Sequence, residues 1–586
     1  MANSELIEPA ALTWRDDQPF APRYDDIYYS GDGIEEFRHV FLNPSELLSR
    51  EDLSDCVQVA ELGFGTGWNF VQCAESIMQS THRRLHYVAF EAHPLTPVDW
   101  QRLAQQRPQP LFQDLAVAAP PLLSGWHRRS FAEGRIQLSV FHGDVLAGLQ
   151  DLQARQRQPI DAWFLDGFDP RKNPKMWQPD VFNALAQCSS KGSRISTFTA
   201  AGQVRRGLAA AGFTMRRVDQ RPRKRESLAG VYTLETKRSK TPQPSEMRVF
   251  GAGIAGCTIA RELANQGIDV ALFDPQGIGT GGSKMQTSAL HCRLLGDSSG
   301  AGEFRARAYH HARQALAHYP SVRAIDAVQL ALSADEVRKQ QRLYDVYAHP
   351  TSPWLQFLEA SKLDQRLGIK ALSGLLFPNS ALINLNLLCQ QLADHPRITL
   401  IPTQGQGRPD VIACASASRD LVTSMPLEIG DVYGQLDWIA PPDIPSADRL
   451  DTAIVGNGYV LPGAEHWVLG STYEQTPWPP ATATEHNITS NQRFLGDGPI
   501  EPVRYQRAAR CVSSDRDPVI GKVDEHTWVS AAHGSMGSSS APFAASLIVS
   551  DVLGWIPPAS PRALASAAPD RFIERQARRG VKKIGV

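Results

Sequence analysis

Residues Met247–Asp274, MRVFGAGIAGCTIARELANQGIDVALFD, decide the fold of the second half of the chain. A short apolar run, Met247–Phe250, leads directly into GAGIAG, and a helical stretch then connects to a second apolar run that ends at Asp274. Strand, GxGxxG loop, helix, strand and acid follow one another in the order of a dinucleotide-binding βαβ unit. Such a unit usually opens a domain, so we expect a second complete domain upstream.

Each glycine of this loop has its own physical role. Gly251 permits the tight turn after the strand, and Gly253 lets the backbone approach a pyrophosphate. Gly256 lets the helix pack closely on the strand. The helix N-terminus then offers free N–H groups and the positive end of its dipole to the phosphates. Asp274 is expected to accept hydrogen bonds from the adenosine ribose.

Length and composition limit the class of protein. A chain of 586 residues is too long for a single hydrophobic core, and 42% apolar with 21% charged residues is typical of a soluble globular protein. No uninterrupted apolar stretch of about 18 residues predicts a membrane helix, and the N-terminus has no signal-peptide pattern. The eight scattered cysteines include no CxxC pair, which argues against a disulfide framework or a metal site and favours the reducing cytoplasm.

A second strand–glycine loop–helix pattern lies near the N-terminus. The apolar run Val57–Leu62 leads into GFGTG, with Gly63, Gly65 and Gly67 in the spacing GxGxG, and a helix is expected from about Trp68. This form resembles the first motif of class I methyltransferases, which bind S-adenosylmethionine (SAM). The resemblance implies an α/β domain built on a Rossmann-like, doubly wound sheet.

Acids at the ends of the next strands fit that resemblance. The strand Leu85–Phe90 ends at Glu91, where the family places an acid on the ribose hydroxyls, and Leu138–His142 is followed by Asp144, close to where these folds bind adenine. Taken alone, each acid is more often a solvated residue at a strand end. In this order they predict a SAM site made of the following residues: Glu61, Gly63, Gly65, Gly67, Glu91 and Asp144.

The strand Ala162–Leu165 then delivers Asp166, followed by the loop GFDPRKNPKMW. In a doubly wound sheet the carboxyl end of such a strand faces the reacting atoms, so Asp166 is the predicted catalytic residue of this domain. Methyltransferases that act on exocyclic amines often carry a D/N-PPY/F motif here, which stacks a flipped base. Because LDGF stands in its place, stacking by that device is not expected; the alternative for the whole loop is a surface turn.

Cationic side chains gather around this expected site, although the net charge of the chain is only −1. A polyanion must therefore be bound by local patches, and an ordinary solvated face is the alternative. The candidate RNA-binding residues are Arg171, Lys172, Lys175, Arg221, Arg223, Lys224 and Arg225.

Residues 236–246, TKRSKTPQPSE, are polar and without periodicity, and they are predicted to be a linker between a domain of residues 1–235 and a domain of residues 247–586. Beyond the βαβ unit, DVYGQLDWI and GNGYVLPGAEHWVLGST predict antiparallel strands of an inserted substrate domain. The glycine-rich stretch His533–Ser540 opens a helix at about Ala541. The N-terminal end of this helix is expected to face a flavin ring, and Gly537, in the stretch that leads into it, is expected to contact the cofactor.

Six stretches together resemble one architecture: ELGFGTGWNF, LDGFDPRKNPKMW, RKRESLAGVY, GAGIAG, GYVLPG with GSTYE, and DRDPVIG. Over nearly the whole chain they are similar to the MnmC family of bifunctional tRNA-modifying enzymes. The resemblance implies an N-terminal SAM-dependent methyltransferase and a C-terminal FAD-dependent oxidoreductase of the D-amino-acid-oxidase type. It further implies removal of the carboxymethyl group from 5-carboxymethylaminomethyl-(2-thio)uridine at the tRNA wobble position, and then N-methylation of the exposed amine.

One motif departs from the family. Near the last helix the family pattern is close to GSRG, whereas this chain has GSSS from Gly537 onward and lacks the arginine. Arg507, Arg510 or Arg516 is expected to replace it.

Two other functions remain open at this point. The same cofactors would serve a small-molecule amine oxidase fused to a small-molecule N-methyltransferase. A non-enzymatic RNA-binding scaffold that senses SAM and FAD is the second alternative, and the intact acids Asp166, Glu91 and Asp274 argue against it. A membrane or DNA partner is not expected.

Overall fold

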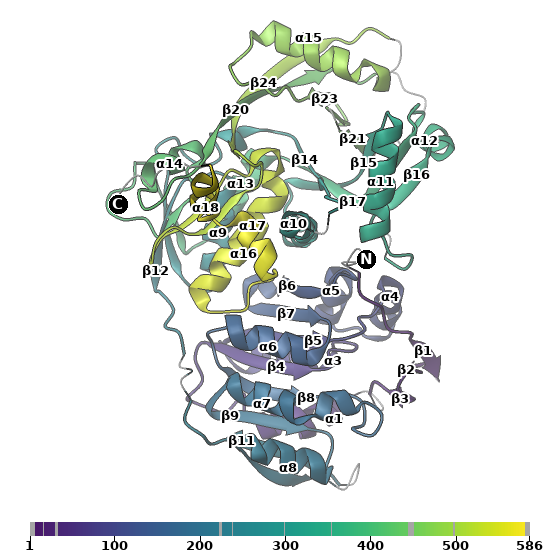
Figure 1. Cartoon of the computed structure of the whole chain (residues 1–586), viewed down its shortest axis with the longest axis vertical. Coiled ribbons are helices and arrows are strands. Elements are labelled where there is room, and N and C mark those ends of the chain that lie inside the picture. Colours follow the sequence, from purple (N-terminus) through teal and green to yellow (C-terminus); the bar gives the residue numbers. More distant parts are fainter. Residues whose placement is uncertain are drawn as a thin grey trace. The chain divides into compact units, whose positions relative to one another are not determined.

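The computed structural model describes residues 6–15, 17–29, 33–221, 226–236, 238, 240–297, 299–352, 354–442, 451–456, 458–495 and 498–579. By their contacts these residues form two compact units (Figure 1). The N-terminal unit comprises residues 6–243 together with 550–559, and the C-terminal unit comprises residues 244–549 together with the chain from 560 onward. In this division the ten residues 550–559, which follow most of the C-terminal unit in the chain, belong to the N-terminal unit. Among the described residues, no helix has the length and apolarity that crossing a bilayer requires.

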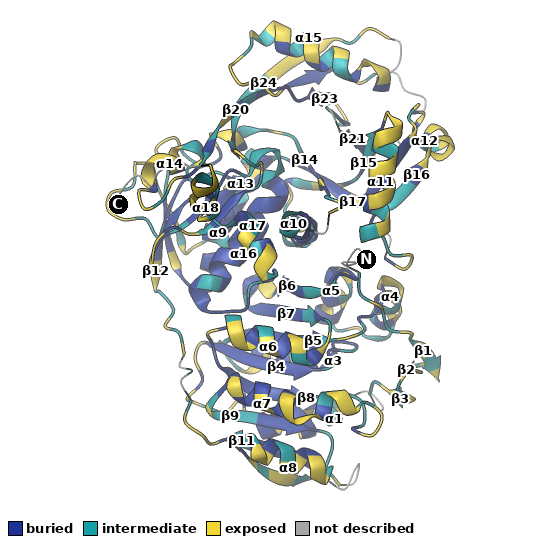
Figure 2. Cartoon of the chain, in the orientation of Figure 1, coloured by how far each residue is buried: buried dark blue, intermediate teal, exposed yellow. Residues whose placement is uncertain are grey.

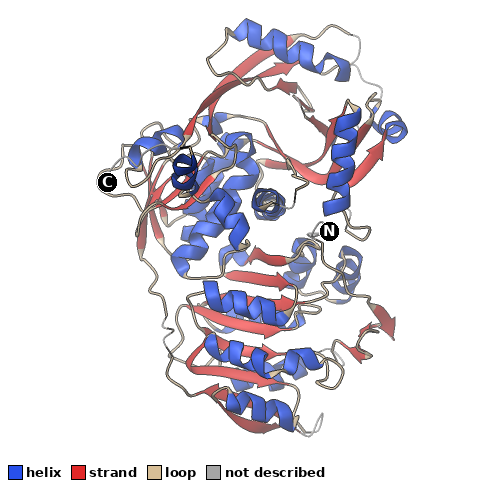
Figure 3. Cartoon of the chain, viewed as in Figure 1, coloured by secondary structure: helices blue, strands red, loops and turns tan. Residues whose placement is uncertain are grey.

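The N-terminal unit is built on one eight-stranded sheet in the order β10-β11-β9-β8-β4-β5-β7-β6 (Figure 3). Strands β9, β8, β4, β5 and β7 are parallel, and β11, β10 and β6 join at the two edges through antiparallel pairings. This is the doubly wound sheet expected from the sequence. The strands are β4 Cys56–Leu62, β5 Arg84–Glu91, β6 Gly125–Phe131, β7 Ile136–His142, β8 Ile160–Leu165, β9 Ser189–Thr197, β10 Phe213–Asp219 and β11 Glu226–Tyr232.

Helices cover both faces of this sheet, so its central strands are buried on both sides (Figure 2). Alternate residues of β8 show this: Ala162 and Phe164 belong to one apolar core, while Trp163 and Leu165 belong to the other. Such a strand reads as a continuous apolar run, as parallel strands buried on both faces do. The longer helices are α3 Trp68–Ser80, α4 Pro97–Gln106, α5 Pro110–Ala118, α6 Val145–Arg155, α7 Pro179–Gln187 and α8 Gly202–Ala210.

A short stretch from far along the chain completes the second of these cores. Ile556 is fully buried among the apolar residues of the N-terminal unit, and its carbonyl accepts a hydrogen bond of 2.7 Å from Arg128. Beside it, the Trp555 ring stacks on His86 with 4.4 Å between ring centroids. The carbonyl of Gly554 accepts hydrogen bonds from two consecutive backbone N–H groups, those of Arg157 and Gln158.

The C-terminal unit contains two sheets. The first has the order β18-β13-β12-β19-β26-β25, parallel except for β25, and helix α9 (Ile254–Asn265) follows β12 as the GxGxxG pattern predicts. It confirms the expected Rossmann-type domain. Its strands are β12 Glu246–Phe250, β13 Asp269–Phe273, β18 Ile398–Ile401, β19 Val411–Ile412, β25 Val519–Lys522 and β26 Trp528–Ala531.

The second sheet is the expected mixed β insertion. It runs β14-β17-β15-β21-β22-β23-β20-β24, with β16 on β17, and β15 with β21 is its parallel pair among the described pairings. Its strands are β14 Ser288–Leu290, β15 Val322–Ala331, β16 Gln356–Glu359, β17 Ser373–Ile383, β20 Ile429–Ile439, β21 Thr452–Val455, β22 Tyr459–Leu461, β23 Trp467–Gly470 and β24 Pro502–Ser513. The main helices of the unit, besides α9, are α10 Gly300–Leu316, α11 Ala334–Tyr347, α12 Ala360–Leu367, α13 Leu385–Ala393, α15 Pro480–Asn491 and α16 Gly537–Leu553.

Close packing at Gly256 gives a first prediction. A Cβ atom at this position would lie 1.7 Å from the carbonyl oxygen of Gly251, so Gly256→Ala must push helix α9 away from its strand. Overpacking of this kind costs about 1–3 kcal/mol. We expect a lower denaturation midpoint for the C-terminal unit by circular dichroism. Gly430→Ala is the matched control, because a Cβ there meets no atom within 4 Å; equal midpoints in the two variants would contradict the packing argument.

Candidate active sites

The glycine loop of the N-terminal unit packs against the end of a neighbouring strand. Gly63, Gly65 and Gly67 all have positive φ, at 88°, 50° and 67°. A Cβ atom on Gly63 would lie 2.0 Å from the backbone carbonyl of Asp166, which follows β8. Loop and strand end therefore meet backbone to backbone, which only glycine at this position allows.

Glu91 lies at the end of β5 and closes this loop from the other side. Its carboxylate accepts hydrogen bonds from the backbone N–H of Gly65, at 2.7 Å, and of His93, at 2.9 Å. Burial raises the pKa of this carboxyl above its usual value. Asp144 follows β7 at the same edge, but its exposed carboxylate caps helix α6 by accepting from the N–H groups of Leu146 and Ala147.

Asp166 and Glu61 are joined by one amide that the sequence analysis missed. The Asn69 side-chain nitrogen, in the first turn of α3, donates to Asp166 at 2.6 Å and to Glu61 at 2.7 Å. The second oxygen of Glu61 accepts from the Tyr87 hydroxyl at 2.9 Å. Burial first, and then the charge of Asp166, raise the pKa of Glu61 well above its usual value. Asn69 therefore holds two acids whose environments differ: Glu61 is 1% exposed, whereas Asp166 is only partly buried.

Beyond Asp166, the loop packs against aromatic residues from the start of the chain. The Phe168 ring stacks on Tyr24, with centroids 4.4 Å apart, and meets the edge of Tyr28 at 5.5 Å. Phe168 thus has stacking partners within the protein.

Four of the expected RNA-binding cations are described, and they lie at the same edge of the sheet, where three of them are paired with aspartates. Arg171 bonds Asp169 at 2.8 Å, Lys172 lies 3.8 Å from Asp26, and Arg221 bonds Asp219 at 2.6 Å. Lys175 is exposed on the same loop as Arg171. Arg223, Lys224 and Arg225 lie outside the described residues. Because β10 and β8 run in the same direction, the turn after β10 is on the same edge as Asp166, three strands away.

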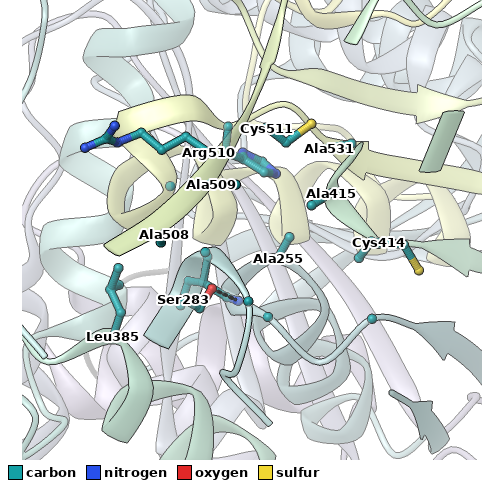
Figure 4. Close-up of a pocket in the computed structure, with 18 of the residues that line it drawn as sticks. Ala255, Ser283, Leu385, Cys414, Ala415, Ala508, Ala509, Arg510, Cys511 and Ala531 are labelled. Atoms are coloured by element: carbon teal, nitrogen blue, oxygen red, sulfur yellow. Dashed lines mark hydrogen bonds between the residues drawn. The ribbon is translucent and has the colours of Figure 1, made fainter. Parts of the chain in front are cut away.

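The C-terminal unit contains a cavity of about 590 Å³ at its glycine loop (Figure 4). Gly251, Gly253, Asp274 and Gly537 line it, as expected of cofactor-binding residues, whereas Gly256 lies behind the loop and packs the helix. One end of the cavity thus combines a helix N-terminus, a glycine-rich loop and an acid. A dinucleotide needs these groups for its pyrophosphate and ribose, so the residues present fit FAD.

Two side chains fix the geometry of this end of the cavity. Asp274 accepts hydrogen bonds from the N–H groups of Ala252, at 2.8 Å, and Gln276, at 2.9 Å. The Ser283 hydroxyl accepts from the N–H of Ile254 at 2.9 Å, at the start of α9. Ser283 was missed from the sequence, although its position in the glycine-rich stretch after β13 is a usable signal.

Arg510 and His533 belong to the other walls. Of the three arginines considered from the sequence, Arg510 alone is among the residues that line the cavity. Its guanidinium donates to the Thr472 carbonyl at 3.2 Å, whereas Arg507 is paired with the fully buried Glu474. The His533 ring lies between the hydroxyls of Ser530 and Ser540, at 3.0 and 2.8 Å, and burial lowers its pKa to about 4.

Comparison with known proteins identifies both units. A family model described as S-adenosyl-L-methionine-dependent methyltransferase matches residues 107–233, and one described as FAD dependent oxidoreductase matches residues 249–550. Proteins named "tRNA 5-methylaminomethyl-2-thiouridine biosynthesis bifunctional protein MnmC" are similar along the whole chain. The one from Pseudomonas putida (strain GB-1) is 30% identical over 98% of this chain and 100% of its own length. The one from Ectopseudomonas mendocina (strain ymp) is 31% identical over 97% and 98%.

Burial of His291 gives a prediction on pH. This ring, 5% exposed, packs edge-on against Tyr459, which lines the cavity, and burial, with a smaller effect of the Arg293 charge, lowers its pKa to about 4. Between that value and the ordinary pKa of about 6.5, the unfolded chain binds more protons at this group than the folded chain. The free energy of unfolding should therefore fall by up to about 3 kcal/mol as pH falls through this window.

The test compares denaturant unfolding of the wild type and His291→Gln at pH 7 and pH 4.5. The variant should lose less stability on acidification, since it has no proton to take up at this site. An identical loss in both proteins would mean that His291 does not contribute.

Proposed function

We propose a function from one premise: the chain belongs to the MnmC family, the bifunctional proteins of tRNA 5-methylaminomethyl-2-thiouridine biosynthesis. The protein is a tRNA-modifying enzyme with two activities, one dependent on FAD and one on SAM. The C-terminal unit removes the carboxymethyl group of 5-carboxymethylaminomethyl-(2-thio)uridine. The N-terminal unit then methylates the amine. The observation that carries the proposal is the presence of both glycine-loop sites in one chain that aligns with its relatives from end to end.

The first reaction breaks the bond between the substrate nitrogen and its carboxymethyl arm. The chemistry that FAD supplies when bound is acceptance of a hydride from the carbon next to the amine. Water then splits the resulting imine into a primary amine and glyoxylate. In this chain we assign Arg510 to the carboxylate of the arm, because Arg510 is among the residues that line the cavity and Arg507 is paired with Glu474. Because burial lowers the pKa of His533 to about 4, this side chain contributes a polar group to the cavity wall without a charge.

The second reaction is an in-line methyl transfer, for which SAM supplies the methyl group. An alkylamine is mostly protonated near neutral pH and must lose its proton before it can attack. We assign Asp166 as the acceptor of this proton, because its partly exposed carboxylate follows β8 beside the glycine loop. Asn69 is a positioning residue: its amide holds one Asp166 oxygen and so sets the direction in which the carboxylate points.

RNA contact in the N-terminal unit is assigned to Arg171, Lys172, Lys175 and Arg221, at the carboxyl edge of its sheet, and to Arg223, Lys224 and Arg225, which lie outside the described residues. The pairing of some of them with aspartates lowers the attraction of each for phosphate, because a phosphate must compete with a carboxylate already in place. The substrate portion is the anticodon loop with its wobble uridine, and the compartment is the cytoplasm.

The main alternative is a small-molecule amine oxidase fused to a small-molecule N-methyltransferase. It predicts turnover of free glycine-like amines and no dependence on RNA. Nucleoside mass spectrometry of tRNA from a strain that lacks this gene separates the two: the carboxymethylaminomethyl nucleoside should accumulate, and unchanged tRNA nucleosides would exclude the proposed function.

Asp166→Ala should lower the methylation rate by about 10²–10⁴-fold, the usual contribution of a positioned proton acceptor. SAM should still bind, measured by calorimetry, because the glycine loop and Glu91 remain. In cells the aminomethyl nucleoside should accumulate. Asp180→Ala, at an exposed position in helix α7, is the control. If the Asp166→Ala variant methylates at the wild-type rate, Asp166 is not the proton acceptor and is only an acid at the end of a strand.

Arg510→Gln should raise the KM of the oxidoreductase step roughly tenfold or more, because a charge-assisted hydrogen bond to a carboxylate contributes about 1.5–3 kcal/mol. Flavin content, read from the visible spectrum, serves as the folding check. Arg516→Gln removes the same charge on the same segment from a residue that does not line the cavity, and it should behave as the wild type. If both variants match the wild type, another group holds the carboxylate.

A further inference from the structure

The C-terminal unit has a second cavity, of about 410 Å³, that neither reaction uses. Its walls come from the segment after β14, from α10, β15 and α11, from the end of β21 and the glycines that follow it, and from the end of α15 and the residues after it. Four cationic side chains line it: Arg293, Arg305, Lys339 and Arg493.

The charge of this cavity is strongly one-sided. Arg305 is paired with Asp517 at 2.8 Å, but within the described part of the chain Arg293, Lys339 and Arg493 have no acidic partner at ion-pair distance. Glu336 is the one acid among the lining residues that the structure describes, and its carboxylate is taken up by the backbone N–H groups of Leu332 and Ser333, at 2.7 and 3.1 Å. The lining is therefore positively charged, and three of its cations are exposed.

Apolar side chains form much of the remaining wall. Leu330, Leu343, Ile454 and Phe494 line the cavity beside the amides of Gln340 and Asn491. Proteins bind single-stranded nucleic acid with groups of these kinds. Exposed cations bind the phosphates, and apolar and amide groups contact the bases.

The second cavity shares a wall with the first. Gly456 and Gly458, just before β22, line the second cavity, and Tyr459, the next residue, lines the first. The His291 ring, which lines the second cavity, meets the edge of Tyr459 with 5.9 Å between ring centroids. An extended RNA strand whose modified uridine enters the first cavity would thus have the second beside it.

We propose that this second cavity binds a nucleotide next to the wobble uridine, with the RNA phosphate held by Arg293, Lys339 and Arg493. The inference rests on the proposed function, because it supplies the C-terminal unit with its own contact to the tRNA. In the proposed reaction the amine and its carboxymethyl arm occupy the first cavity with FAD. A neighbouring nucleotide would then occupy the second cavity.

The experiment measures flavin bleaching when tRNA that carries the carboxymethylaminomethyl uridine is mixed anaerobically with the full-length holoenzyme. The variant is Lys339→Glu/Arg493→Glu, two residues that do not line the flavin cavity. We expect the tRNA concentration for half-maximal bleaching to rise roughly tenfold or more, with the limiting rate unchanged. The salt dependence should become shallower by about 0.7 in the log–log slope for each RNA phosphate that the variant no longer neutralises.

Lys362→Glu, an exposed lysine of α12 outside both cavities, is the control and should resemble the wild type. Lys339→Gln/Arg493→Gln, a milder change, guards against misfolding and should shift in the same direction by less. A double variant that matches Lys362→Glu in both concentration dependence and salt slope overturns the inference. If tRNA fails to bleach the wild-type flavin at all, the proposed function itself is wrong.

Discussion

Both sites depend on the same constraint, the hydrogen bond between an acid at the end of one strand and the glycine loop at the end of the strand beside it. Glu91 accepts from the Gly65 N–H in the N-terminal unit, and Asp274 accepts from the Ala252 N–H in the C-terminal unit. Each bond holds a glycine loop against the carboxylate at the end of the neighbouring strand. The loop can adopt this path only because its glycines lack side chains.

The two units differ in what they add to this shared plan. In the N-terminal unit, the buried Asn69 side chain joins Asp166 to Glu61, so the partly exposed acid is held by an amide that also contacts a fully buried one. In the C-terminal unit, a cavity wall made by β22, β24 and the start of α16 brings together groups from distant parts of the chain. The site of the N-terminal unit is held by one short network of side-chain hydrogen bonds. The site of the C-terminal unit depends on the fold of the whole mixed sheet.

The sequence was sufficient for features that are local in the chain. Strand, glycine loop, helix and acid lie within about thirty residues of one another, so spacing predicts the motif of Gly253 and Asp274, and the resemblance to class I methyltransferases predicts that of Gly63 and Glu91. It was insufficient where a role is set by contacts between distant segments. Strand β6 at the sheet edge was not foreseen, and the second cavity draws its cations from separate segments of the chain, from Arg293 to Arg493.

The ten residues 550–559 have a consequence for how the gene can be divided. The hydrophobic core of the N-terminal unit includes Ile556, and the buried His86 ring is covered by Trp555, yet both are encoded after nearly all of the C-terminal unit. A single cut between residues 243 and 244 would leave the N-terminal unit without Trp555 and Ile556. A lineage that separated the two activities into independent genes would first need another way to fill that gap in the core.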